Sequence, residues 1–179
     1  MASLMLDIET LGTQPDTVIL TVGAIKFNPA SDAEPFDGLY CRLDVNEQLL
    51  MNRSVDDSTL EWWNSQKEDV RNEALSDDDR TGLLQFTKEL NRAVAGVSEI
   101  WAQGPTFDFT ILENLYKQLG VPVPWHYWQI RDSRTLFKVV GEPRIPGRDQ
   151  AHNALADCYY QARGIQQIYK QLNLNNSEK

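Results

Sequence analysis

The residues of this sequence best suited to chemistry are four acids and one histidine. Asp7 and Glu9 lie two residues apart near the start of the chain, Asp108 follows a Gly-Pro pair, and His152 precedes Asp157 by five residues. Carboxylate oxygens are the ligands that Mg²⁺ and Mn²⁺ prefer, and an imidazole can accept a proton near neutral pH. Four acids gathered at one end of a sheet would form an oxygen-rich site for hard cations, with a general base beside it.

The first two acids lie on a segment with the alternation of a β-strand. Leu4, Leu6 and Ile8 share one face, so the carboxylates of Asp7 and Glu9 leave the other face, roughly 7 Å apart at Cα. Two acids this close repel each other and lose hydration unless a cation lies between them. The pair alone is equally compatible with a solvated sheet face.

The elements that must position these side chains follow from periodicity and turn signals. β-rich segments cover residues 4–9, 18–27, 39–43, 99–103 and 127–131. Helical spacing begins near residue 58 and continues at 69–75, 82–97, 107–119, 133–140 and 153–172. The first three strands have short links and suit an antiparallel meander, and the later strands alternate with helices. The predicted fold class is α/β, a mixed five-stranded sheet flanked by helices.

Length and composition predict one domain over residues 1–179, with a frayed tail at 174–179. Two separate cysteines exclude a disulfide scaffold and a cysteine-based zinc site. No apolar run reaches 18 residues and no signal peptide opens the chain, so we expect a cytoplasmic protein without a membrane partner.

The net charge of −9 argues at first against a nucleic-acid partner, because such binding depends on Lys and Arg. The charge is uneven, however. Residues 56–79 hold nine acids and two bases, whereas residues 114–148 hold six bases and two acids. The acidic segment predicts a solvated surface that need not face a substrate, and the basic segment could line a site for phosphates.

Three motifs give the acids a familiar arrangement. "DIET" at residues 7–10, "GPTFD" at 104–108 and "HNALAD" at 152–157 resemble the three motifs of the DEDDh 3′-5′ exonucleases, a family with a ribonuclease H-like fold. The chain looks most similar to the compact bacterial and phage group that contains the phage T4 exonuclease and a mycobacterial exoribonuclease. It departs at Gly104, where many relatives have an Asn near the substrate.

The resemblance implies a two-metal-ion hydrolysis of phosphodiesters. Asp7, Glu9, Asp108 and Asp157 would hold two divalent ions, Mg²⁺ or Mn²⁺, with Asp7 bridging them. His152 would be the general base that takes a proton from the attacking water. The glycine- and proline-rich loop at 141–150 would be a lid beside His152, or an ordinary surface loop.

The resemblance also implies a pocket for the last nucleotide. Thr10, Leu11 and Gly12 would meet the terminal nucleotide, with Leu11 either wedged against the base or closing a strand end. Phe107 and Trp63 are candidates for base stacking, although core packing explains Trp63 as well. Phosphate contacts would come from the basic segment, at Arg131, Arg134, Arg144 and Arg148.

The predicted function is 3′-to-5′ exonucleolytic hydrolysis of single-stranded DNA or RNA, with release of nucleoside 5′-monophosphates. The alternatives are an RNA-specific exonuclease that trims 3′ tails and a catalytically silent nucleic-acid-binding module. A homodimer is also compatible with the resemblance. No residue is identified that would contact the 2′ hydroxyl, so the sequence does not predict whether the substrate is DNA or RNA.

Overall fold

A five-stranded mixed sheet forms the centre of the protein, as seen in a computed structural model that describes residues 2–143, 145–146 and 152–174. The strand order is β3-β2-β1-β4-β5. β1 (Ser3–Thr10), β2 (Ile19–Phe27) and β3 (Phe36–Arg42) make an antiparallel meander, and β4 (Glu99–Ala102) and β5 (Ile130–Asp132) extend it in parallel with β1. The predicted mixed α/β sheet is confirmed.

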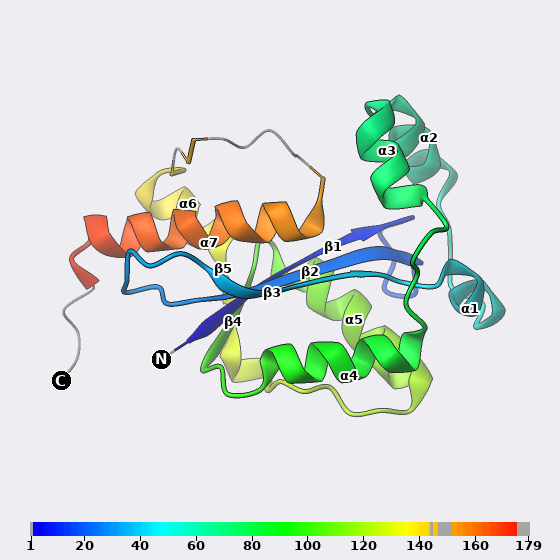
Figure 1. Cartoon of the computed structure of the whole chain (residues 1–179), viewed down its shortest axis with the longest axis horizontal. Helices are drawn as coiled ribbons and strands as arrows, with labels where there is room; N and C mark the ends of the chain where they lie inside the picture. The colour runs from blue at the N-terminus through cyan, green and yellow to red at the C-terminus, as the bar shows by residue number, and fades with distance from the viewer. Residues whose placement is uncertain (1, 144, 147–151, 175–179) are drawn as a thin grey trace.

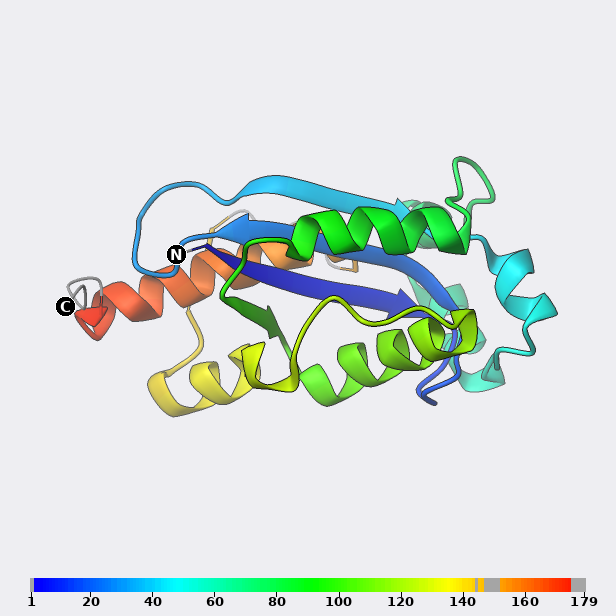
Figure 2. The ribbon, with the colours of Figure 1, turned by 90° about the horizontal axis from the view of Figure 1, so that it is seen from below.

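Helices cover both faces of the sheet (Figures 1 and 2). α4 (Leu83–Val94) and α5 (Pro105–Leu119) lie on one face, where Leu4, Leu6 and Ile8 of β1 join the larger core cluster. α6 (Ser133–Val140) and α7 (Ala154–Gln171) lie on the opposite face with Met5. Asp7 and Glu9 alternate in phase with Met5, so their carboxylates leave β1 on the α7 face.

Three short helices stand at the end of β1 (Figure 1). They are α1 (Val45–Leu50), α2 (Asp57–Ser65) and α3 (Glu68–Leu75). α1 is not predicted by the sequence patterns, because its six residues are too few to show a helical period. Among the described residues, no helix has the length and apolar character needed to cross a bilayer.

The segment at 127–131 corrects the sequence prediction. Tyr127–Gln129 form a 3₁₀ turn (η1), and the strand is shorter and begins only at Ile130. The Tyr127 and Trp128 side chains raise the apparent β propensity of the segment, but both are exposed, at 83% and 57%. Residues 144, 147–150 of the predicted lid and 175–179 of the predicted frayed tail lie outside the described residues.

Two features of the sheet bring the acids together. β1 pairs with β4 only over Ser3–Met5, so the β4 side of β1 is open from Asp7 onward. On its other side Asp7 pairs with Gly23 of β2, and a Cβ at Gly23 would lie 2.3–2.4 Å from backbone atoms of Ala154 and Leu155. The first turn of α7 therefore rests directly on β2 beside Asp7, which only glycine permits.

We expect Gly23→Ala to destabilise the protein by about 3 kcal/mol or more, because the added methyl group must push the backbone of α7 away. Urea unfolding followed by circular dichroism measures the change. Gly38→Ala is the matched control, since the atoms nearest to its Cβ would be side-chain carbons of Leu155 and Ile25, the closest at 3.3 Å. Equal losses in the two variants would contradict the proposed contact.

Candidate active site

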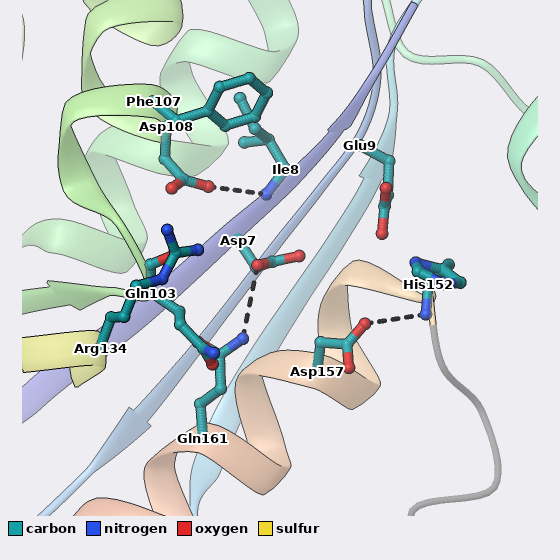
Figure 3. Close-up of a pocket in the computed structure, with 10 residues that line it drawn as sticks. All are labelled: Asp7, Ile8, Glu9, Gln103, Phe107, Asp108, Arg134, His152, Asp157 and Gln161. Atoms are coloured by element: carbon teal, nitrogen blue, oxygen red, sulfur yellow. Dashed lines mark hydrogen bonds between the residues drawn. The ribbon is translucent and has the colours of Figure 1, made fainter. Parts of the chain in front are cut away.

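Three carboxylates from two elements converge at the C-terminal half of β1. One oxygen each of Asp7, Glu9 and Asp157 lies within 4.8 Å of the others. Figure 3 shows Asp7 and Glu9 on β1 facing Asp157 at the start of α7. The pocket that contains them has a volume of about 260 Å³, and its described lining is Asp7, Ile8, Glu9, Gln103, Phe107, Asp108, Arg134, His152, Asp157 and Gln161.

Asp108 joins this pocket from the first turn of α5. Its Oδ1 accepts a hydrogen bond from the backbone N–H of Ile8 at 3.2 Å, and the residue is only 4% exposed. The bond exists because β4 has already ended, which leaves this amide of β1 without a strand partner. Pro105 at the start of α5 and Gly104 with φ of +108° make the turn that brings Asp108 back to β1.

The acids strongly perturb one another. Burial raises the pKa of Asp7 well above its usual value, and the charges of Asp108, Glu9 and Asp157 raise it further. Burial and the charges of Asp157 and Asp108 raise the pKa of Glu9 to about 8. Burial raises the pKa of Asp108 to about 7, although its backbone hydrogen bonds and the nearby Arg134 oppose the shift. The cluster is unfavourable at neutral pH unless protons or cations neutralise it.

The donor set fits a hard divalent cation. All four acids offer oxygen, and Gln161 adds an amide oxygen, Oε1, that is buried and has no hydrogen-bond partner within the described parts of the chain. Its Nε2 lies 3.5 Å from Asp7 Oδ1. A buried amide oxygen without a partner beside crowded carboxylates suits a cation or the water that a cation holds.

His152 lines the pocket beside Asp157. Its backbone N–H donates to Asp157 Oδ2 at 2.9 Å, and its φ of +67° lies in the left-handed region. A non-glycine residue in that region costs of order 1 kcal/mol and is retained where neighbours hold it. The indole of Trp62 on α2 supplies a second contact, edge-on to the imidazole at a centroid distance of 4.9 Å.

The tryptophan pair corrects one prediction. Trp63 is 1% exposed, and its Nε1 donates to the carbonyl of Thr10 at 2.9 Å, so this ring supports the end of β1 and does not offer a face for stacking. Trp62 is the ring that is 40% exposed. Trp62 belongs to the acidic segment and contacts the imidazole of His152, so this segment borders the site, which its charge alone did not indicate.

The residues after the first motif form a closed turn. Thr10, Leu11 and Gly12 are buried, and Thr10 Oγ1 donates to the carbonyl of Gly12 at 2.6 Å. Leu11 packs in the cluster that contains Trp63, so its side chain closes the strand end and does not project as a wedge. Phe107 does line the pocket and is partly exposed, as a stacking surface requires.

The structure separates the predicted basic contacts. Arg131 makes an ion pair with Glu99 at 3.0 Å and donates to the carbonyls of Trp128 and Ile130, outside the pocket. Its predicted contact with substrate is therefore not supported by its position. Arg134 lines the pocket. Arg144 and Arg148 lie outside the described residues.

Sequence reasoning missed three residues of the site, namely Gln103, Gln161 and Trp62. Gln161 has a detectable signal, because it follows Asp157 by four residues and so shares its helix face. Gln103 directly follows β4, next to the Gly-Pro turn. For Trp62 the signal is ambiguous, since either member of the pair could be the buried one.

Comparison with known proteins assigns the chain to a protein family. Residues 2–169 match the family described as the 3′-5′ exoribonuclease Rv2179c-like domain. The chain belongs to this family. Membership confirms the predicted family of 3′-5′ exonucleases and the predicted enzyme class. An exodeoxyribonuclease of Enterobacteria phage T4 is 29% identical over 78% of this chain and 72% of the phage protein.

Solved structures agree at the level of the fold. E. coli exonuclease I in complex with a dT13 oligonucleotide aligns with a TM-score of 0.68 and 15% identity. The zinc-bound complex of the same enzyme with single-stranded DNA aligns with a TM-score of 0.66 and 14% identity. Each comparison covers 97% of this chain but only 42% of exonuclease I. This likeness confirms the predicted ribonuclease H-like fold.

The raised pKa of Glu9 gives a test of the acid cluster. In the folded protein Glu9 keeps its proton up to about pH 8, whereas the unfolded chain releases it near 4.5, so the free energy of unfolding without metal falls as pH rises between these values. We expect Glu9→Gln to weaken this pH dependence and to stabilise the metal-free protein at pH 8 by at least about 1 kcal/mol. Denaturant unfolding in a chelating buffer at pH 5 and pH 8 measures both effects.

The control is Glu61→Gln, which removes an exposed acid of α2 outside the pocket. Parallel pH profiles for wild type and Glu9→Gln would contradict the raised pKa of Glu9.

Proposed function

We propose that this protein is a divalent-metal-dependent 3′-5′ exonuclease that acts on single-stranded nucleic acid, DNA or RNA, and releases nucleoside 5′-monophosphates. One observation carries the proposal: carboxylates from β1 and α7 converge within 4.8 Å in a pocket that Asp108 and His152 also line. The raised pKa values of Asp7, Glu9 and Asp108 support it, because these acids need a cation to be ionised together at neutral pH.

Asp7, Glu9, Asp108 and Asp157 would hold two ions, Mg²⁺ or Mn²⁺. When bound, such ions stabilise the charge that develops on the attacked phosphate and on the leaving oxygen. Asp7 would be the central ligand, because the charges of Asp108, Glu9 and Asp157 all act on it and its Oδ1 lies 3.5 Å from Nε2 of Gln161. The amide of Gln161 would orient the Asp7 carboxylate from behind.

His152 would act as the general base. It would accept the proton of a water whose oxygen forms a new bond to the last phosphorus, while the bond from phosphorus to the 3′ oxygen of the preceding nucleotide breaks. The terminal nucleotide then leaves as a 5′-monophosphate, and the shortened strand keeps a 3′ hydroxyl. The hydrogen bond from the His152 backbone to Asp157 and the contact with Trp62 would keep the imidazole at the pocket.

RNA specificity is the second candidate function. The matching family is described as exoribonuclease, whereas the phage relative is an exodeoxyribonuclease. Discrimination would require a contact or a clash at the 2′ hydroxyl. The same assay on strands of each sugar decides between the two.

We expect a 5′-labelled single strand of about 20 nucleotides to give a ladder of one-nucleotide steps with Mg²⁺ or Mn²⁺, and none with EDTA. Asp7→Ala should abolish the ladder, because it removes the central ligand of the acid cluster. His152→Ala should lower the rate roughly 10²- to 10⁴-fold and leave metal binding intact, because only the proton acceptor is lost. Gel electrophoresis of DNA and RNA strands in parallel measures direction and sugar preference together.

Glu61→Ala is the matched control, since it removes an exposed acid of α2 outside the pocket. The mechanism fails if Asp7→Ala matches wild type, and the exonuclease assignment fails if neither strand is shortened by the wild-type protein.

Thermal unfolding separates an enzyme of this kind from a silent binding module. Mg²⁺ or Mn²⁺ should raise the midpoint of wild type, since a ligand that binds only the folded state stabilises it by about 2.7 kcal/mol at 100 times its dissociation constant. Asp7→Ala should respond much less, and Glu61→Ala should respond like wild type. A wild-type midpoint that ignores both ions would favour the silent module.

A further inference from the structure

The acid pocket adjoins a second cavity whose described lining includes two basic side chains. This second cavity has a volume of about 360 Å³ and shares Gln103 and Arg134 with the acid pocket. Its other described lining residues are Phe137, Lys138, Gly141 and Glu142. α6 forms one side of it, so a bound molecule could extend from the acid cluster along this helix.

Arg134 lines both cavities, and contacts with Gln103 and Gly104 hold its side chain in place. One guanidinium nitrogen donates to the carbonyl of Gln103 at 2.8 Å. The central carbon Cζ and both terminal nitrogens of the guanidinium lie 3.2 Å from the position where a Cβ on Gly104 would be. The guanidinium therefore covers Gly104, and a side chain at this position would displace it.

The glycine is required for a second reason. Gly104 has φ of +108°, a conformation that L residues rarely adopt, and it begins the turn that carries Asp108 to β1. Arg134 therefore places its positive charge directly over the glycine of this turn.

The guanidinium retains donors for a ligand. A guanidinium has five N–H donors, and within the described residues that of Arg134 donates one hydrogen bond and forms no ion pair within 4 Å, although its charge acts on Asp108. Lys138 follows one helical turn later, is exposed, and lines the same second cavity. Glu142 is the one carboxylate in the described lining of this cavity, so the two cations outnumber it.

We propose that Arg134, assisted by Lys138, binds the phosphate on the 5′ side of the scissile phosphodiester. This assignment rests on the proposed exonuclease function. The positive charges of Arg134 and Lys138 attract the next anionic group of a bound strand, and a guanidinium matches phosphate geometry with paired donors. Gly104 leaves the space that this guanidinium needs, and the bond to Gln103 fixes its direction.

A strand with one neutral linkage tests the position of the contact. We would measure release of the first nucleotide from two strands, one unmodified and one with a methylphosphonate at the second linkage from the 3′ end. Wild type should lose roughly 10- to 100-fold in kcat/KM on the neutral linkage, as expected for a charge-assisted contact. Arg134→Gln should lose a similar factor on the unmodified strand, mainly through KM, and little more on the modified one.

Two controls keep the result specific. A methylphosphonate at the fifth linkage should behave like the unmodified strand with every variant. Arg92→Gln removes an exposed arginine of α4 on the opposite face of the sheet and should match wild type. Lys138→Gln should show a smaller version of the Arg134→Gln pattern.

A binding experiment without metal gives a readout that is independent of turnover. Fluorescence anisotropy of a labelled strand, measured over a range of salt, should give a slope of log affinity against log salt that is smaller by about 0.7 in Arg134→Gln than in wild type. The assignment would be overturned if the loss caused by Arg134→Gln and the loss caused by the neutral linkage simply multiplied in the variant on the modified strand. An unchanged salt slope would also overturn it. If wild type cuts neither strand, the exonuclease function itself fails, which is a distinguishable result.

Discussion

Mutual repulsion among carboxylates is the constraint on which the rest of this structure depends. Asp7, Glu9 and Asp157 bring oxygens within 4.8 Å of one another, and Asp108 is buried beside them. Such a cluster costs folding free energy at neutral pH in the absence of a cation, as the raised pKa of Glu9 indicates. Its neighbours must therefore be held by interactions strong enough to offset the repulsion. Two features position the carboxylates despite this repulsion, namely the close contact of α7 with Gly23 and the hydrogen bond from Ile8 to Asp108.

These two features work from opposite sides of β1. On one face of the sheet, Gly23 lets the backbone of α7 approach β2 closely. This close approach brings Asp157 near Asp7, which pairs with Gly23. On the β4 edge, an early strand end leaves an amide unpaired, and Asp108 accepts from it. A sheet in which β4 ran further along β1 would satisfy that amide with backbone and exclude Asp108. The short strand is thus part of the site.

The sequence predicts the site better than it predicts the site's surroundings. The acids could be located because strand alternation, a Gly-Pro turn and a helix start fix where Asp7, Glu9 and Asp108 point. Trp63 and Arg131 could not be judged in the same way, because burial and ion pairing depend on contacts between elements distant in sequence. Trp63 reaches the carbonyl of Thr10 across 53 residues, and Arg131 pairs with Glu99 on the adjacent strand. Helix α1 was missed because six residues carry no measurable period.

The structure places the acidic and the basic segments of the chain on different sides of the acid cluster. The acidic helices α2 and α3 lie on one side of the first turn of α7, and α6, which carries Arg134 and Lys138, lies on the other (Figure 1). A polyanion is repelled from the first side and attracted to the second, so the field favours one direction of approach to the acid cluster. The α2 side contributes an aromatic contact through Trp62, which an uncharged base can use. A protein with a net charge of −9 can therefore still suit a phosphate chain, provided that the strand enters along α6 and places only its terminal base toward α2.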